Sequence, residues 1–435
     1  GALAAAEMRH DGLPFARAEH ERTLERLLGP RPRPGERPPT LERLAGEIRT
    51  LLSAPQLNPD SHPHLLRELR RNGLDVSSTS KWELQGNDHP VVPILLEYKS
   101  LARLASANGW VWMDTWVAGD RFRSDYVPSG VVTGRWSSRG GGALSLPKVI
   151  RSAVRADEGW SLVIVDAAQL EPRILAAMSA DTAMMAAGAR GDLYQGLVDG
   201  GVVDTREHAK VAMLGALYGS TTGTAGMLVP RLARAYPRAI AHVDGAARTG
   251  EAGGIVTTWL GRSSPPASAA WREAQAGASG MEAGQAEESR ARSRAREWGR
   301  FTRNFVVQGT AAEWALSWMA GVRQTLRGLR APDGGASPHL AFCLHDELVV
   351  HTPDALVTEV VRAMEDAAAQ ASRLLFPHLA PPVSSTGAPP LPLVPLDVVV
   401  SRSYAEAADP VDPTDSLDVD DSASLGLPVA ASDPN

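Results

Sequence analysis

The chain of 435 residues has a single cysteine, Cys343, and only four lysines among its 44 basic residues. One cysteine excludes a disulfide framework and a cysteine-rich zinc site, and it is typical of a reducing compartment. No run approaches the roughly 18 apolar residues of a membrane span, and the N-terminal GALAAAEMRH lacks the layout of a signal peptide. With 43% hydrophobic residues, we expect a cytoplasmic protein with two or three packed domains and no membrane partner.

The formal net charge of −6 argues against a nucleic-acid binder, but the acids are unevenly distributed. The segment after Tyr404 holds eight acids, four prolines and no base, which predicts a disordered acidic tail over 405–435. Without it, 44 bases face 42 acids, so the remaining body has a net charge of +2. The body is therefore slightly basic.

Two basic tracts stand out within this body. Residues 131–155 carry five bases and no acid, and residues 290–303 carry six arginines and one acid. Such tracts attract phosphate, although a solvated protein face would explain either tract alone. The general excess of arginine over lysine is attributed to GC-rich coding.

The apolar periodicity predicts both helices and strands. The first ~100 residues predict amphipathic helices, separated by the proline-rich segment 30–39; these helices cover 21–29, 41–52, 64–73 and 89–107. From Trp110 the pattern changes to short strands and glycine turns, with buried strands at 161–165 and 340–344. The intervening stretch is helical with a glycine-rich interruption near 244–280, and 381–395 is a proline-rich loop. The sequence has no internal repeat. It also lacks the strand–helix alternation that would indicate a doubly wound sheet.

Acidic residues follow both predicted strands. Asp166 ends the first, and a helix is predicted to start at Pro172. The second strand reaches His345, Asp346 and Glu347 before another apolar run, which predicts a hairpin with acids at its turn. Two aspartates converging in one sheet can hold two Mg²⁺ ions about 3.5–4 Å apart for phosphoryl transfer. The alternative is that acids simply end strands where the strands meet solvent.

The segment 204–219 predicts a helix with functional residues along one face. Asp204 and Glu207 form an expected capping box, and Gly219 can end the helix. Spacing by four residues places the following side chains on one stripe: Arg206, Lys210, Leu214 and Tyr218. Such a stripe suits a triphosphate followed by a sugar and a base, although an amphipathic helix with solvated charges fits equally well. Lys210 is one of only four lysines, which favours function.

A further candidate begins within the second arginine tract. Gln308, before Gly309 and Thr310, is predicted to open a helix, and its amide could read acceptors in a DNA groove. Asn304 and Arg300 lie one helical turn apart upstream.

Taken together and in order, these segments resemble the family A (DNA polymerase I-like) DNA polymerases. The similar motifs are TGRWSS at 133–138, VDAAQLEPR at 165–173, REHAKVAMLGALYG at 206–219, RNFVVQGTAAE at 303–313 and LHDE at 344–347. The segments 8–15, 57–69 and 94–106 are similar to phrases of the family's thumb region. The pattern is closest to the polymerase module of the actinobacterial-type 3′–5′ exonuclease/DNA polymerase proteins, and no acidic exonuclease pattern precedes the thumb.

The resemblance implies an α+β right-hand fold with an antiparallel palm sheet, helical fingers and a helical thumb. The expected parts are a lead-in at 1–19, the thumb at 20–109, the palm at 110–185 and 299–404, the fingers at 186–298 and the tail at 405–435. It also implies a nucleoid-associated monomer that uses dNTPs to extend a primer on template DNA, without proofreading in this chain.

The resemblance further implies a role for each motif residue. Asp166, Asp346 and the backbone carbonyl of Ala167 would bind two Mg²⁺ ions, which Mn²⁺ could replace, with Glu347 in a lesser role nearby. Lys210 would also act in catalysis by offsetting charge on the triphosphate. The residues expected to contact the nucleotide are Arg206, Lys210, Leu214, Tyr218, Glu171, Gln169 and Tyr194, with Glu171 as the steric gate against a ribose 2′-hydroxyl. The residues expected to contact DNA are Arg135, Arg173, Arg300, Asn304, Gln308 and His345.

Several positions depart from the family pattern. Ala167 and Ala168 stand where Tyr-Ser is usual, Leu214 replaces the expected aromatic, and Tyr194 replaces a frequent histidine that contacts the triphosphate. These departures predict a loosened nucleotide pocket. Leu214 and Ala167 also leave open a catalytically degenerate polymerase fold that binds primer-template or a protein partner. A third interpretation is a metal-dependent nuclease that uses the same two aspartates, although the helix 206–219 would have no obvious use in it.

Overall fold

The computed structural model describes residues 1–407 except 190, 221, 281–282, 333 and 380–392. Most of the predicted acidic tail and of the predicted proline-rich loop therefore lies outside the described residues. The start of the tail is different from the prediction, because Tyr404–Ala407 forms a short 3₁₀ helix, η5. Within the described residues, no helix is both long enough and apolar enough to cross a membrane.

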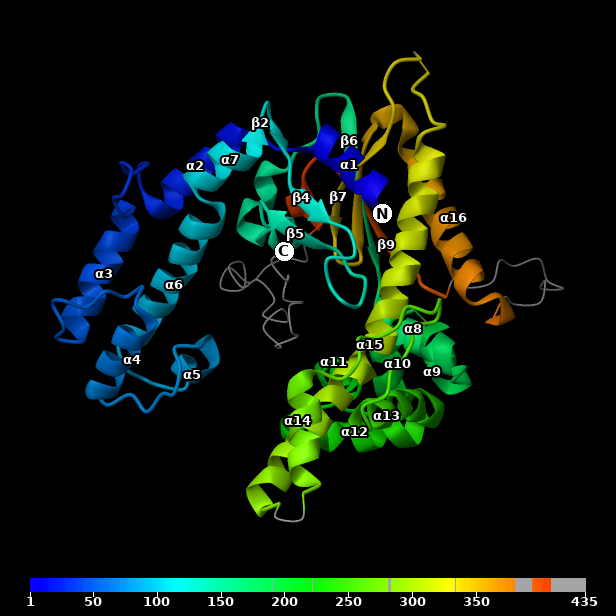
Figure 1. The fold of residues 1–435 in the computed structure, drawn as a ribbon. Coiled ribbons are helices and arrows are strands. Elements are labelled where there is room, and N and C mark those ends of the chain that lie inside the picture. Colours follow the sequence, from blue (N-terminus) through cyan, green and yellow to red (C-terminus); the bar gives the residue numbers. More distant parts are fainter. Residues whose placement is uncertain (190, 221, 281–282, 333, 380–392, 408–435) are drawn as a thin grey trace.

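The N-terminal helices form an arm that projects from the rest of the molecule (Figure 1). It contains α2 (Arg17–Leu28), α3 (Pro39–Leu51), α4 (His62–Arg71), α5 (Lys81–Gln85) and α6 (Val91–Asn108). The predicted amphipathic helices are thus confirmed, and their apolar faces are buried against one another, as at Leu44, Ile48 and Leu95.

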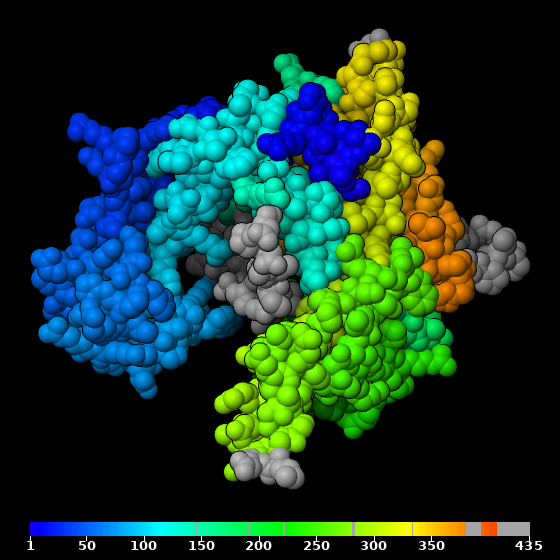
Figure 2. Space-filling view, in the orientation of Figure 1, coloured from blue at the N-terminus to red at the C-terminus, as the bar shows by residue number. Residues whose placement is uncertain are grey.

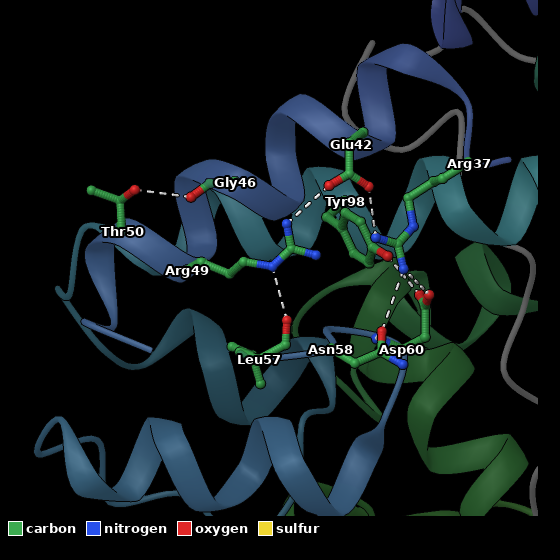
Figure 3. A network of polar contacts seen from close by, with 9 residues as sticks. All are labelled: Arg37, Glu42, Gly46, Arg49, Thr50, Leu57, Asn58, Asp60 and Tyr98. Atoms are coloured by element: carbon green, nitrogen blue, oxygen red, sulfur yellow. Dashed lines mark hydrogen bonds and ion pairs between the residues drawn. The ribbon is translucent and has the colours of Figure 1, made fainter. Parts of the chain in front are cut away.

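A polar network ties the two long helices of this arm to the loops between them (Figure 3). Arg37 donates to Glu42 at 3.0 Å and to Asp60 at 2.7 Å, and the hydroxyl of buried Tyr98 donates to the other oxygen of Asp60 at 2.6 Å. Arg49 donates to Glu42 at 2.9 Å. The proline-rich segment 30–39 is therefore fastened through Arg37 to α3 and, by way of Asp60, to α6.

The centre of the molecule is a four-stranded antiparallel sheet with the order β7-β8-β6-β9. Its strands are β6 (Trp160–Ala167), β7 (His339–Leu344), β8 (Glu347–Pro353) and β9 (Leu396–Ser401). Both predicted strands and the hairpin are confirmed, and β6 is longer than predicted because it begins at Trp160 and continues past Asp166 to Ala167. Helix α16 (Val357–Leu375) packs against β6, β8 and β9. The remaining short 3₁₀ segments here are η3 (Asp354–Leu356) and η4 (Pro377–Leu379).

Smaller elements connect the arm to the sheet. They are α1 (Ala2–Asp11), α7 (Trp110–Trp116), the strands β1 (Leu13–Pro14), β2 (Val117–Ala118), β3 (Arg121–Phe122), β4 (Asp125–Val127) and β5 (Ser137–Gly140), and the 3₁₀ helices η1 (Ala143–Ser145) and η2 (Lys148–Ala153). The predicted change to strands at Trp110 was premature, because helix α7 precedes β2.

A group of helices lies at the opposite side from the arm (Figure 1). It comprises α8 (Leu170–Ser179), α9 (Thr182–Ala189), α10 (Leu193–Asp199), α11 (Arg206–Tyr218), α12 (Gly223–Ala235), α13 (Pro237–Glu251) and α14 (Ala269–Ala278). Figure 2 shows the surface hollowed between this group and the N-terminal arm. The 42-residue helix α15 (Gln285–Leu326) joins the group to the sheet.

Four local predictions need correction. Helix α8 starts at Leu170 rather than at Pro172, which is nevertheless in its first turn. The cap of α11 is Thr205, whose hydroxyl accepts from the N–H of His208, and not the predicted Asp204. Gln308 does not open a helix, because it lies in the middle of α15. The interruption predicted near 244–280 is shorter, since α13 continues to Glu251.

Buried histidines make the fold sensitive to acid. His351 is fully buried, stacks on Trp160 at 4.4 Å between ring centroids, and accepts a hydrogen bond from the N–H of Asp157 at 3.3 Å. Burial, together with repulsion from His339, lowers the pKa of His351 from 6.5 to about 3. The unfolded chain therefore binds the proton more strongly than the native chain between these values, and stability falls as the pH drops through this window.

We expect His351→Gln, which keeps a hydrogen-bond acceptor, to reduce this loss of stability. The measurement is urea unfolding at about pH 7.5 and about pH 5, compared between variant and wild type. The exposed-site control is His62→Gln. The prediction would be contradicted if the unfolding free energy of His351→Gln fell between the two pH values by as much as that of the wild type.

Candidate functional site

Three carboxylates line up across one end of the sheet, on the neighbouring strands β8, β6 and β9. In the antiparallel register Asp166 lies opposite Glu347 on β8 and opposite Asp397 on β9. Directly opposed residues project from the same face of a sheet. The expected convergence of Asp166 with the acidic hairpin is therefore seen in the structure.

Asp397 is a residue that the sequence analysis missed. A signal was present, because Asp397 directly precedes three valines, just as Asp166 follows an apolar run. What the sequence could not supply was the pairing of β9 with β6, which joins segments more than 200 residues apart.

Asp346 approaches the end of β6 from the hairpin turn. Its backbone carbonyl accepts from the N–H of Ala167 at 3.0 Å. The preceding residue, His345, is exposed and has a left-handed backbone with φ 56°. This turn conformation sets the two aspartates at the same end of the sheet.

The site has an excess of negative charge. The carboxylate of Asp166 reaches solvent but is recessed, and this partial burial, followed by repulsion from Asp346, Glu347 and Asp397, raises its pKa to about 7. Burial also raises the pKa of Asp346, against the opposing effect of Arg135. Burial raises the pKa of Glu347 as well, although the hydroxyl of Tyr404 donates a hydrogen bond to it.

This donor set fits a divalent cation. Carboxylate oxygens are the ligands that Mg²⁺ prefers, and Mg²⁺ usually takes only one or two of them together with water and substrate phosphate. In the ranges that the structure describes, no three His, Cys, Asp or Glu side chains form a ready-made metal cluster. Asp166 and Asp346 would thus need a backbone or substrate oxygen beside them, and Ala167 is the next residue of β6.

Both ends of α11 contact the segment that follows β6, or a residue bound to it. At the start of α11, Nε of Arg206 donates to Asp192 at 2.6 Å, and Asp192 accepts from Nε2 of Gln169 at 2.5 Å. At its end, the hydroxyl of Tyr218 lies 3.5 Å from Glu171. The remaining members of the predicted stripe lie between these two points, with Lys210 exposed and Leu214 half-buried. The helix is thus held beside the acidic end of the sheet.

Glu171 and Arg135 form a buried ion pair in the same region. Nη2 of Arg135 donates to Oε1 of Glu171 at 2.5 Å. Burial raises the pKa of Glu171, and the positive charge of Arg135 works in the opposite direction. The predicted steric gate and one predicted DNA contact therefore lie in direct contact.

Helix α15 presents unsatisfied polar atoms nearby. Asn304 and Gln308 are buried, and both amide atoms of Asn304 and Oε1 of Gln308 lack a well-formed hydrogen bond within the described residues. Arg300 precedes them by one turn and approaches Gly219, where a β-carbon would lie 2.9 Å from its Cγ. Asn304 also lies within hydrogen-bonding reach of Tyr218, and Gln308 within reach of Glu171. Atoms without a well-formed bond here retain hydrogen-bonding capacity for a ligand.

Two predicted contacts have partners inside the protein. Arg173, predicted to contact DNA, is buried and donates to the carbonyls of Ala168 and Gly188, each at 3.0 Å. Its other donors reach Gln169 at 3.3 Å and the carbonyl of Gly191. Tyr194 is also buried, and its ring centroid lies 5.6 Å from Cζ of Arg206.

Comparison with known proteins identifies the architecture. The model of DNA polymerase family A matches residues 44–380. DNA polymerase I of Chloroflexus aurantiacus is 26% identical over 338 residues, covering 72% of this chain and 33% of its own length. The thermostable DNA polymerase I of Thermus filiformis is 27% identical over 371 residues, covering 74% of this chain and 41% of its own length. This chain thus spans about a third to two fifths of the length of these relatives.

A solved structure is similar over almost the whole chain. The POL domain of Pol1 from M. smegmatis, in complex with DNA primer-template and dNTP, superposes with a TM-score of 0.70 at 19% identity, covering 94% of this chain and 70% of that one. The likeness confirms the expected α+β right-hand fold. The family model spans most of the sequence, and the protein therefore belongs to DNA polymerase family A.

Proposed function

We propose that the protein catalyses template-directed transfer of dNMP from a dNTP to the 3′-hydroxyl of a DNA primer. The observation that carries the proposal is the contact of both ends of α11 with the segment after β6, Arg206 by way of Asp192 and Tyr218 at Glu171. The same end of β6 bears Asp166 and is bonded to the backbone of Asp346. A pair of carboxylates beside a helix that bears Arg206 and Lys210 suits a nucleotide whose triphosphate undergoes nucleophilic attack. Family membership and the DNA-bound structural relative support the same partners.

The three structural parts correspond to a hand around this site. We assign the thumb to 20–109, the fingers to 186–298 and the palm to 110–185 together with 299–404. The support is the arrangement of the N-terminal arm, the opposite helix group and the central sheet between them (Figure 1).

Asp166, Asp346 and the carbonyl of Ala167 would hold Mg²⁺, with Mn²⁺ as a substitute and Glu347 close by. Bound there, the ions would favour ionisation of the primer hydroxyl and offset charge on the phosphates. The raised pKa of Asp166 supports this assignment, because the charges that act on this carboxylate are the negative ones of Asp346, Glu347 and Asp397.

The nucleotide would lie along the stripe on α11. Arg206 and Lys210 would bind its phosphates, where positive charge offsets the negative charge that develops on the leaving group. Leu214 and Tyr218 would lie beside the sugar and the base. Glu171, held by Arg135, would block a ribose 2′-hydroxyl.

The duplex would contact α15 and the hairpin turn. Asn304 and Gln308 would donate and accept hydrogen bonds at base edges, where their amide atoms find the partners that they lack. Arg300, His345 and the basic tract 131–155 would contact the primer-template backbone.

Primer extension tests the proposal directly. Wild-type protein with dNTPs, Mg²⁺ and a primer-template should extend the primer, and Asp166→Asn or Asp346→Asn should slow extension by roughly 10³-fold, because metal ligation contributes several kcal/mol. Tight duplex binding without incorporation would instead support a degenerate binding module. Mg²⁺-dependent degradation without dNTPs would support a nuclease.

Charge relief should be visible in thermal stability. Without divalent ions at about pH 8.5, Asp166→Asn should raise the Tm by about 1–2 °C, a small effect because solvent screens the charge. Added Mg²⁺ should then stabilise the wild type more than the variant. Exposed Asp366→Asn is the control, and an equal Mg²⁺ response in all three proteins would contradict a cation site at Asp166.

The departure at Leu214 should affect sugar contact. Leu214→Tyr should lower the dNTP KM by about 2- to 10-fold and improve use of dideoxynucleotides, because a ring adds contact with the sugar. Val211→Tyr places a ring on the exposed side of the same helix and is the matched control. Unchanged KM and dideoxynucleotide use in Leu214→Tyr would refute the assignment.

A further inference from the structure

Tyr194 is buried at the first turn of α10. Only 8% of the residue is exposed, and its ring centroid lies 5.6 Å from Cζ of Arg206 on α11. This distance is within the range of a cation–π contact. The phenol thus contacts the guanidinium that is proposed to bind phosphate.

Asp192 fixes the same guanidinium from another side. Nε of Arg206 donates to Oδ2 of Asp192 at 2.6 Å, while Oδ1 accepts from Nε2 of Gln169 at 2.5 Å and from the N–H of Tyr194 at 2.8 Å. Partial burial works to raise the pKa of Asp192, but the hydrogen bonds from Arg206 and Gln169 hold it below its usual range. Asp192 is therefore ionised, and it joins the start of α10 to the start of α11 and to the turn after β6.

The arrangement leaves one edge of Arg206 for a ligand. Half of the arginine side chain is exposed, and Nε serves Asp192. Within the part of the chain that the structure describes, neither Nη atom makes a hydrogen bond to protein. A guanidinium has a planar fork that matches phosphate oxygens, and its orientation decides whether the fork can be used.

We infer that Tyr194 is a positioning residue, whose ring holds Arg206 with both Nη atoms directed to the phosphates of the bound dNTP. The inference rests on the proposed function and concerns the same site. The ring would restrict the arginine side chain before the nucleotide arrives, which lowers the entropy lost when phosphate binds. Burial raises the pKa of Tyr194 to about 12, so the phenol stays neutral beside the triphosphate.

The test measures nucleotide binding without chemistry. A primer-template with a dideoxy-terminated primer is bound to the protein with Mg²⁺, and the Kd of the next correct dNTP is determined. Tyr194→Phe keeps the ring and should bind within about twofold of the wild type, whereas Tyr194→Leu should weaken binding about 3- to 5-fold. With an extendable primer, Tyr194→Leu should raise the dNTP KM more than it lowers kcat.

A double-mutant cycle separates positioning from direct contact. In the Arg206→Ala background, Tyr194→Leu should have no further effect on the Kd, because the ring acts only through the arginine. Additive effects, or a loss in Tyr194→Phe equal to that in Tyr194→Leu, would overturn the inference. Gln195→Ala removes a surface contact with Asp199 on the same helix and should leave the Kd unchanged.

These outcomes are distinct from failure of the proposed function. If the wild type binds dNTP but does not extend a primer, the polymerase proposal fails while the cycle still measures the role of Tyr194. If the wild type extends primers and all Tyr194 variants bind dNTP equally, the inference alone fails.

Discussion

The register of β6 between β8 and β9 is the constraint on which the candidate site depends. It sets Asp166 opposite Glu347 on one side and opposite Asp397 on the other. A slip of one residue would send Asp166 to the opposite face of the sheet. The apolar run Leu162–Val165, almost completely buried, prevents such a slip, because the same slip would disrupt the packing of these side chains. Hydrophobic packing thus holds like charges together that would otherwise separate.

Around this acidic centre, two arginine side chains are held in place by carboxylates that lie outside the sheet. Glu171 pairs with Arg135, and Asp192 pairs with Arg206. Glu171 follows the turn after β6, and Asp192 is hydrogen-bonded to Gln169 within that turn. One short segment therefore positions the side chains proposed to contact the sugar and the phosphates. The protein bears the cost of ordering these side chains during folding rather than during binding, which is the general advantage of preorganisation.

Much of this was predictable from local sequence. The strands, the hairpin and the helix from Arg206 to Tyr218 have clear periodicity, and Gly219 ends that helix with φ 71° as predicted. The continuity of α15 was not predictable, because Gly309 resembles a helix break. The structure explains it as a packing contact, since a β-carbon at Gly309 would lie 2.4 Å from Cγ2 of Thr258. Contacts between separate segments of the chain thus determine whether a helix tolerates Gly309. Such contacts also determine that Arg173 is buried against the carbonyls of Ala168 and Gly188.

Helix α15 has a mechanical consequence. Its 42 residues extend about 63 Å, and Trp314 and Trp318 anchor its second half through hydrogen bonds to Ser372 and Met364 of α16. In its first half, Arg303 donates hydrogen bonds to the carbonyl of Ala216 on α11 and to the carboxylate of Asp244 on α13. A tilt of one degree over this length corresponds to a displacement of about 1 Å at the far end. The continuous helix therefore couples the position of the outer helices to that of the sheet.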